Sequence, residues 1–366
     1  MEQLAEVRKV ASGRRSALAL FLFVMAFFVE AAFGESLSDA LGIDYDLAYV
    51  IAGSVAAVCF VALLGGKGLL RPDAASVRRM LRLGWWLLLV GAAMGAMDLL
   101  DFLSSGETPD PSWAAKLVGV ALLCLFIGIE EEAMFRGLLL HGILARSGRT
   151  RRGVILACVA SSLLFGLAHV SELDASDPVQ LLQAALKVAQ TGTYGFVLAA
   201  ATLSGRPDEP DSIFAGALFH GLDDFLAMFV SIGLMGESSE VSYVATGADA
   251  WPTVTLYAVL TILYLPSVVR AAFWLRALDV PQLGGIARRE GQPAPPPVPD
   301  GACVGPVMEP SGAAPGLGAT DASGAEGRDA GAGGAEGRDA GAGGAEGRDA
   351  NLGGGPGAVG RPPRPW

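Results

Sequence analysis

Long apolar stretches, separated by short polar connections, run along this chain from about residue 16 to residue 275. A helix needs about 20 predominantly apolar residues to cross a bilayer, and only helices satisfy their own backbone in lipid where no barrel pattern is present. The pattern therefore predicts an all-α, polytopic transmembrane helical bundle of about eight spans. We expect these spans near residues 16–34, 47–65, 83–104, 113–135, 153–170, 180–203, 212–235 and 252–275.

Charge alternates between successive connections of this bundle. Lysines and arginines gather before the first span, between the second and third, between the fourth and fifth, and after the last, whereas the other connections are mainly acidic. The connection between the sixth and seventh spans is the weakest case, because Arg206 lies beside three acidic residues. Basic loops stay on the cytoplasmic side. We therefore expect an integral, multi-pass protein of a bacterial plasma membrane, with its N- and C-termini in the cytoplasm.

The composition is typical of a protein embedded in a lipid bilayer. It is 52% hydrophobic with a mean hydropathy of +0.46, which is too apolar for a soluble domain of this size. The net charge is −11 and is unevenly distributed along the chain. The sequence has no cluster of basic residues of the kind that binds nucleic acid, so we expect no nucleic acid partner. The four cysteines form no Cys-x-x-Cys pair, which argues against a cysteine zinc site or a disulfide framework.

The composition changes at about residue 284 to glycine, alanine, proline and scattered charge. The sequence Ala-Glu-Gly-Arg-Asp-Ala occurs there three times, at 325–330, 335–340 and 345–350. Such a segment cannot bury enough apolar surface to offset the entropy lost on ordering, so we expect a disordered cytoplasmic tail. The predicted parts are spans one to three (1–111), spans four to eight (112–283) and the tail (284–366).

Three glutamates, Glu130 to Glu132, interrupt the end of the fourth apolar stretch. Charged side chains inside a membrane span are costly, so they are a functional hypothesis by default. Glu132 and Arg136 are four residues apart and can pair on one helix face, while Glu131 points about 100° away. The alternative is a cluster at the cytoplasmic end of the helix, with side chains that reach toward water.

Two of the three histidines also fall within apolar stretches, each with a neighbour at helical spacing. Phe165 and His169 share a face of the fifth span, and His220 and Asp224 share a face of the seventh. At 1.5 Å per residue, Glu131 and His169 each lie about 25 Å from the basic turn that joins their spans, so they are level with each other. The alternative for each histidine is a structural contact between helices or a place at the membrane interface.

Together, Glu131, His169, His220 and Asp224 would form one polar site inside the bundle. A carboxylate with an imidazole is a general-base set that can activate water. Two histidines with carboxylates also match a catalytic zinc ion that keeps an open position, which makes Zn²⁺ a candidate cofactor and all four residues candidate metal ligands. The sequence does not distinguish these arrangements, and both suit hydrolysis of an amide within or beside the membrane.

At these residues the chain resembles the CPBP family of intramembrane proteases, the CAAX-protease and bacteriocin-processing family, which includes the CAAX prenyl endopeptidase. Three family motifs occur in order, each on a separate predicted span. The resemblance as a whole covers roughly residues 112–235. The motifs are Glu-Glu-x-x-x-Arg at Glu131, Glu132 and Arg136, Phe-x-x-x-His at Phe165 and His169, and His-x-x-x-Asn/Asp at His220 and Asp224.

The resemblance implies an intramembrane endopeptidase, and a metalloprotease if zinc is bound, acting on a membrane-associated protein or peptide. Glu131 would activate the attacking water with help from His169, and His220 with Asp224 would bind the oxyanion or complete a metal site. An ionised Asp224 can only accept hydrogen bonds, so it is protonated, orients His220 or binds metal. Glu132 and Arg136 would form a structural ion pair, supported by Phe165.

The competing class is a non-proteolytic membrane protein, either a scaffold or a proton-coupled transporter, that uses the same carboxylate–histidine cluster. Three further polar residues are set aside. We expect His141 to be interfacial, Lys187 to reach toward a membrane surface, and Glu30 to lie near the outer boundary without a special role.

Overall fold

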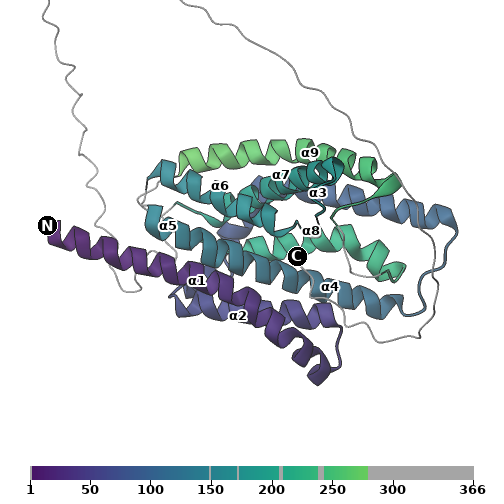
Figure 1. Cartoon of the computed structure of the whole chain (residues 1–366), viewed down its shortest axis with the longest axis horizontal. Coiled ribbons are helices and arrows are strands. Elements are labelled where there is room, and N and C mark those ends of the chain that lie inside the picture. The colour runs from purple at the N-terminus through teal and green to yellow at the C-terminus, as the bar shows by residue number, and fades with distance from the viewer. Residues whose placement is uncertain (1, 148–149, 171–172, 206–208, 238–242, 279–366) are drawn as a thin grey trace, which may run out of the picture. The chain divides into compact units, whose positions relative to one another are not determined.

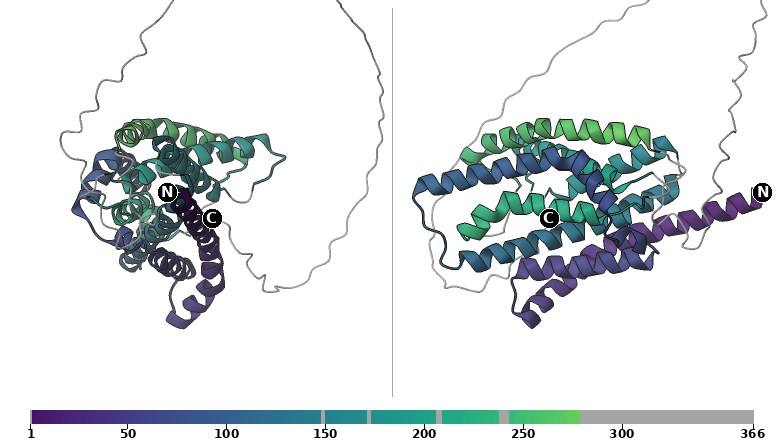
Figure 2. Two further views of the ribbon diagram at one scale, coloured as in Figure 1. Left: turned by 90° about the vertical axis from the view of Figure 1, so that its left-hand side faces the viewer. Right: turned by 180° about the vertical axis from the view of Figure 1, so that it is seen from behind.

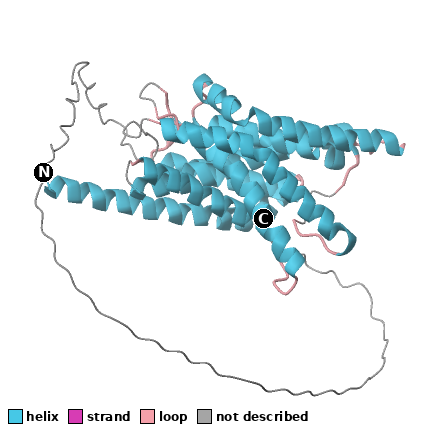
Figure 3. Ribbon diagram, turned by 90° about the horizontal axis from the view of Figure 1, so that it is seen from above, coloured by secondary structure: helices cyan, strands magenta, loops and turns pink. Residues whose placement is uncertain are grey.

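A computed structural model describes residues 2–147, 150–170, 173–205, 209–237 and 243–278, with side chains described from residue 13 onward. Every regular element in these ranges is a helix, and no strand occurs among them (Figure 3). This confirms the predicted all-α fold. The tail expected at 284–366 lies outside the described residues.

The described part of the chain forms nine α-helices with short 3₁₀ and π segments (Figure 1). The α-helices are α1 (Glu2–Leu41), α2 (Tyr45–Leu63), α3 (Ala74–Ser105), α4 (Trp113–Glu131), α5 (His141–Ser147), α6 (Arg151–Ala168), α7 (Pro178–Thr202), α8 (Phe214–Met228) and α9 (Ala250–Ala277). The π segments are η2 (Glu132–Leu140) and η3 (Phe229–Leu234), and the 3₁₀ segments are η1 (Lys67–Leu70) and η4 (Gly247–Asp249).

Side-chain caps fix where four of these helices begin. Asp44, Asp73, Thr150 and Asp177 each accept a hydrogen bond from a backbone N–H in the first turn of α2, α3, α6 and α7 respectively. Such caps satisfy donors that the helix itself leaves unpaired. In α7 the first helical residue is Pro178, whose fixed φ suits that position.

Seven helices in the described residues are long and apolar enough to cross a membrane, which agrees with about eight predicted spans. A 25-residue helix also forms at the predicted sixth span, as α7, but it is not among the seven. The reason is polarity, since Gln180, Gln183, Lys187 and Gln190 all lie on it. The seven candidate spans support an integral, multi-pass membrane protein.

Glycines allow the helices that carry the motifs to pack with their backbones in contact. A side chain at Gly128 of α4 would meet the Ala217 carbonyl of α8, and one at Gly221 of α8 would meet the backbone of α4 at Cys124. Gly166 of α6 is likewise in contact with the backbone of α7. Small residues permit this close approach in membrane bundles. They bring the fourth, fifth and seventh predicted spans to one place.

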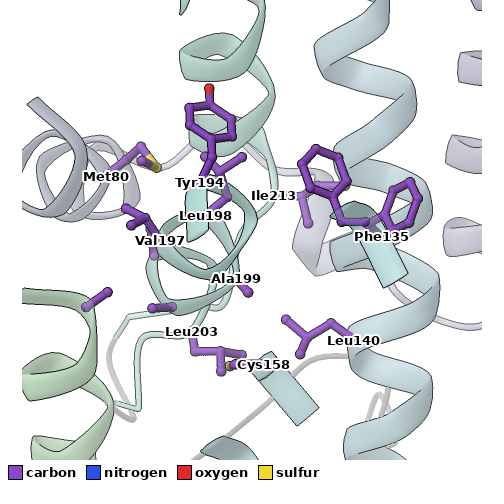
Figure 4. Packing of buried hydrophobic residues seen from close by; sticks show 14 of the residues in the cluster. Met80, Phe135, Leu140, Cys158, Tyr194, Val197, Leu198, Ala199, Leu203 and Ile213 are labelled. Carbon is purple, nitrogen blue, oxygen red and sulfur yellow. The ribbon is translucent and has the colours of Figure 1, made fainter. Parts of the chain in front are cut away.

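Helices α1 and α2 lie side by side, as Figures 1 and 2 both show, and α7 packs against α6 and α9. A buried apolar cluster fills the space where α7, η2, α6 and α3 meet, with Leu140, Cys158, Leu198 and Leu203 fully or almost fully buried (Figure 4). Tyr194 borders this cluster, and its hydroxyl points away from the apolar residues (Figure 4). The Tyr194 ring lies 5.3 Å from the ring of His220, which belongs to the site described next.

Candidate active site

The structure brings together the four side chains expected to form the site, from three different helices. Glu131 is the last residue of α4, His169 caps the C-terminus of α6, and His220 and Asp224 lie one turn apart on α8. The Glu131 carboxylate lies 3.3 Å from His220 Nε2 and 3.7 Å from His169 Nε2. His220 Nε2 is also 3.7 Å from Asp224 Oδ2. Glu131 therefore lies between two imidazoles.

Exposure separates the two glutamates of the first motif. The side chains of Glu132 and Arg136 are 0% exposed and form an ion pair of 2.8 Å between Oε1 and Nη1. Those of Glu131 and His169 keep 12% and 14% exposure, and that of Asp224 keeps 23%. Water or a substrate can reach Glu131 but not Glu132. The expected pairing of Glu132 with Arg136 is present, with Glu131 left facing the histidines.

Arg136 is held by three kinds of contact at once. Besides its ion pair with Glu132, its Nη2 donates to the Gly195 carbonyl of α7 at 3.1 Å. Its guanidinium also stacks over the Phe165 ring, 4.3 Å from the ring centre. A buried cation needs such partners, because removing one would leave charge uncompensated in a dry environment. Arg136 thereby links η2 to α6 and α7 beneath the cluster.

Phe165 contacts His169 as well as Arg136. Its ring centre lies 4.7 Å from that of His169 in an edge-on arrangement, and its carbonyl accepts a hydrogen bond from His169 Nδ1 at 2.8 Å. A carbonyl can only accept, so the proton is on Nδ1. In the neutral ring this leaves the Nε2 lone pair facing Glu131.

His220 lies among three carboxylates. Its Nδ1 is 3.5 Å from Glu132 Oε1, while Nε2 faces Glu131 and Asp224. The Tyr194 ring covers one side of the imidazole, with centres 5.3 Å apart. The ring is thus positioned by contacts from α4, η2 and α7.

The zinc hypothesis fits these side chains only in part. Two ligands of one tetrahedral zinc ion lie about 3.3 Å apart, close to the Glu131–His220 distance of 3.3 Å. Within the described residues, however, no three His, Cys, Asp or Glu groups converge so that they could hold one metal ion. Zinc bound by these four residues therefore stays a prediction.

Sequence reasoning missed the aromatic and basic residues beside the cluster. The Tyr243 ring lies 5.9 Å from that of His169, and Lys187, expected to reach toward a membrane surface, lies with Nζ 4.2 Å from the centre of Tyr243. Tyr243 sits in a connection without helical periodicity, so no pattern marks it. Lys187 gave a signal, because it interrupts an otherwise neutral span.

Two residues set aside from the sequence have partners in the bundle. His141 is 1% exposed; its Nδ1 donates to the Arg136 carbonyl at 2.6 Å, and its Nε2 lies 3.7 Å from Asp211. Glu30 is 0% exposed, and its carboxyl lies with that of Glu130 beside Gly53. A single sequence does not show this burial, because it does not reveal which helix covers which face. The depth of both residues in the bilayer stays a prediction.

The described residues form a bundle of membrane-spanning helices with a carboxylate–imidazole cluster between the spans. This combination of fold and site is typical of intramembrane proteases. Residues 112–263 match the family model described as Type II CAAX prenyl endopeptidase Rce1-like. Through this region the chain is similar to that family, which supports the resemblance to the CPBP family seen in the motifs. The match begins where expected and extends beyond residue 235 into α9, while α1 to α3 lie outside it. Searches of curated proteins and of solved structures gave no match.

Proposed function

We propose that this chain is an intramembrane endopeptidase that hydrolyses a peptide bond near the C-terminus of CAAX-type, membrane-associated proteins or peptides, with Glu131 as the general base. The observation that carries the proposal is the partly exposed carboxylate of Glu131 between the imidazoles of His169 and His220. The family match supports CAAX protease activity at the level of the family. The residue roles that follow are our own assignment.

Glu131 accepts a proton from a water molecule as the water oxygen attacks the scissile carbonyl carbon. His169 Nε2, whose lone pair faces the same space, orients that water. When the tetrahedral intermediate collapses, the carbon–nitrogen bond breaks and Glu131 returns the proton to the leaving amine. The products are a shortened chain with a new carboxyl group and a released peptide with a new amino group.

His220 and Asp224 stabilise the negative oxygen of the intermediate. A protonated Nε2 of His220 donates toward the oxyanion, and such a preorganised donor contributes about 3–4 kcal/mol in other acyl-transfer sites. The family motif accepts asparagine or aspartate at the position of Asp224. The shared property is a side chain that can hydrogen-bond, so we assign Asp224 as a protonated donor or as the group that orients His220.

Replacement of Glu131 tests the proposal, with its neighbour as a matched control. In Glu131→Gln, the amide cannot take the proton, so cleavage of a prenylated CAAX peptide should fall at least about 100-fold. Glu130→Gln removes a carboxylate from the adjacent buried position, which faces Glu30 and Gly53 instead of the imidazoles, and should cleave at the wild-type rate. Both variants are purified in detergent and assayed for peptide release, with folding checked by size exclusion.

Equal cleavage by wild type and Glu131→Gln would remove the assignment. If neither wild type nor Glu131→Gln cleaves the peptide, and the cellular role of the protein survives in Glu131→Gln, the chain is a scaffold instead. Zinc is tested separately. Metal analysis of the purified protein measures bound zinc. If it finds one equivalent of zinc that is lost in His169→Ala, the mechanism with Glu131 as a metal-free general base is wrong and a zinc site takes its place.

A further inference from the structure

Lys187 is a cation beside the candidate active site. It lies on α7, and within the part of the chain that the structure describes no carboxylate approaches its ammonium to ion-pair distance. Its Nζ instead lies 4.2 Å from the ring centre of Tyr243 and 5.5 Å from that of Tyr257. Aromatic faces attract a cation but leave room for an anion on its free side.

The wall around Lys187 is held in place by the protein itself. Gln183, one turn earlier on α7, donates to the Ala245 and Ala250 carbonyls at 3.0 Å and accepts from Ala245 N at 2.7 Å. The Tyr257 hydroxyl donates to the Tyr243 carbonyl at 2.9 Å. These bonds fix the segment that carries Tyr243 against α7 and α9. Lys187 therefore lies in a preformed aromatic corner rather than on a freely moving surface.

This corner adjoins the reacting groups at a defined distance. The Tyr243 ring centre is 5.9 Å from the His169 ring centre and 4.2 Å from Lys187 Nζ. The distance from Lys187 Nζ to the His169 ring centre is therefore at most the sum of these two lengths, about 10 Å. Lys187 is also within electrostatic reach of Asp224 and Glu131. An extended segment of three residues spans at most about 10 Å.

We propose that Lys187, with Tyr243 and Tyr257, binds the C-terminal α-carboxylate of the substrate, three residues beyond the scissile bond. The proposal rests on the function proposed above. A CAAX sequence ends three residues after its cysteine, so cleavage at that cysteine leaves a terminal carboxylate at the distance Lys187 can reach. A charge-assisted contact of this kind in a partly dry corner is stronger than a neutral hydrogen bond. It would select chains that end there over internal peptide segments.

The test compares two peptides that differ only at their terminus. One prenylated peptide ends in a free carboxylate and the other in a carboxamide, and full-length protein in detergent micelles cleaves each. We expect wild type to prefer the free acid by at least about tenfold in kcat/KM, chiefly through KM, because a hydrogen bond to a charged group contributes that much. Lys187→Met should cleave the free-acid peptide no faster than the carboxamide peptide, and its rate on the carboxamide peptide should equal that of wild type. Lys187→Arg should keep the preference for the free-acid peptide.

Lys116→Met is the matched control, since it removes a lysine that pairs with Asp110 instead of facing the site. It should retain the full preference for the acid. Equal cleavage of both peptides by wild type, a preference that survives in Lys187→Met, or an equal loss on both peptides in that variant would overturn the carboxylate site.

If wild type cleaves neither peptide, the proposed function fails. Fluorescence-anisotropy binding of the two labelled peptides to wild type and Lys187→Met then decides the carboxylate site. Tighter binding of the acid that depends on Lys187 supports the site, and its absence overturns it.

Discussion

Phe165 contacts a residue from each of the three motifs. Its ring lies under the Arg136 guanidinium, edge-on to His169, and 5.9 Å from the ring of His220. The ring is 1% exposed, so it cannot contact substrate from solvent. The phenylalanine of the second motif is therefore explained by packing. It sets the distance between the buried ion pair and the two imidazoles.

Asp224 is the residue whose charge state matters most for the mechanism. Because the motif admits asparagine at this position, a neutral hydrogen-bonding side chain should suffice. We expect Asp224→Asn to retain at least about a tenth of wild-type kcat, and Asp224→Ala to lose about 100-fold through loss of oxyanion stabilisation. Single-turnover assays on the same CAAX peptide measure both. A deep loss in Asp224→Asn would instead assign the ionised carboxylate an indispensable role in orienting His220.

At the scale of elements, the site depends on how closely α4 approaches α8. Gly128 faces backbone atoms of α8 that cannot yield. Gly128→Val should force the helices apart, separate Glu131 from His220 and lower kcat by at least about 100-fold, since small misplacements of catalytic groups have effects of this size. Gly119→Val is the control, because nothing lies within 4 Å of a side chain placed there on the same helix.

Thermal unfolding in detergent accompanies the activity assay for both glycine variants. A Gly128→Val protein with wild-type activity would show that the site does not need this close approach. Gly119→Val is expected to match wild type in both measurements.

Motif spacing predicted which residues meet, and packing decided the rest. The i, i+4 spacing of Glu132 with Arg136 and of His220 with Asp224 places each pair on one face, and the basic turn places Glu131 level with His169. All of this follows from helix geometry. Glu30 and Tyr243 could not be assigned, since their roles come from contacts between distant segments. Nor does residue type mark the π segment η2, most of whose residues are ordinary helix formers.

At the scale of the whole described unit, helices outside the matched region are joined to it by buried polar contacts. The side chains of Glu30 on α1 and Glu130 on α4 are buried, and their carboxyl groups lie together beside α2. A side chain at Gly53 of α2 would meet both carboxyls. Helices α1 and α2 are thus fitted around a residue adjacent to Glu131.

The connection from α3 to α4 makes a second such link outside the spans. Gly106, at φ +74°, ends α3, and Asp110 N donates to the Leu234 carbonyl of η3 at 2.8 Å. The Asp110 carboxylate accepts from Ser112 and from Lys116. Chiefly the Ser112 hydroxyl, followed by Lys116, lowers the pKa of Asp110 from its usual 3.8 to about 2.

A depressed pKa means that the ionised form favours the folded state. The contribution of Asp110 is therefore fully present above about pH 4 and is lost as the pH falls toward 2. We expect the difference in melting temperature between wild type and Asp110→Asn to be constant from pH 8 to pH 5 and to shrink below pH 4. Differential scanning fluorimetry across that range checks this, and a difference that grows on acidification would contradict it.

The π-helical turn of η2 has a consequence for the ancestry of this helix. A π turn bonds each residue to the fifth along instead of the fourth, so it holds one residue more than the α-helical turn it replaces. Related chains that keep an unbroken α-helix here would reach the same membrane boundary with a residue fewer. An alignment of such chains should therefore open a one-position gap within residues 132–140, and the presence of that residue would separate chains with the π turn from chains without it.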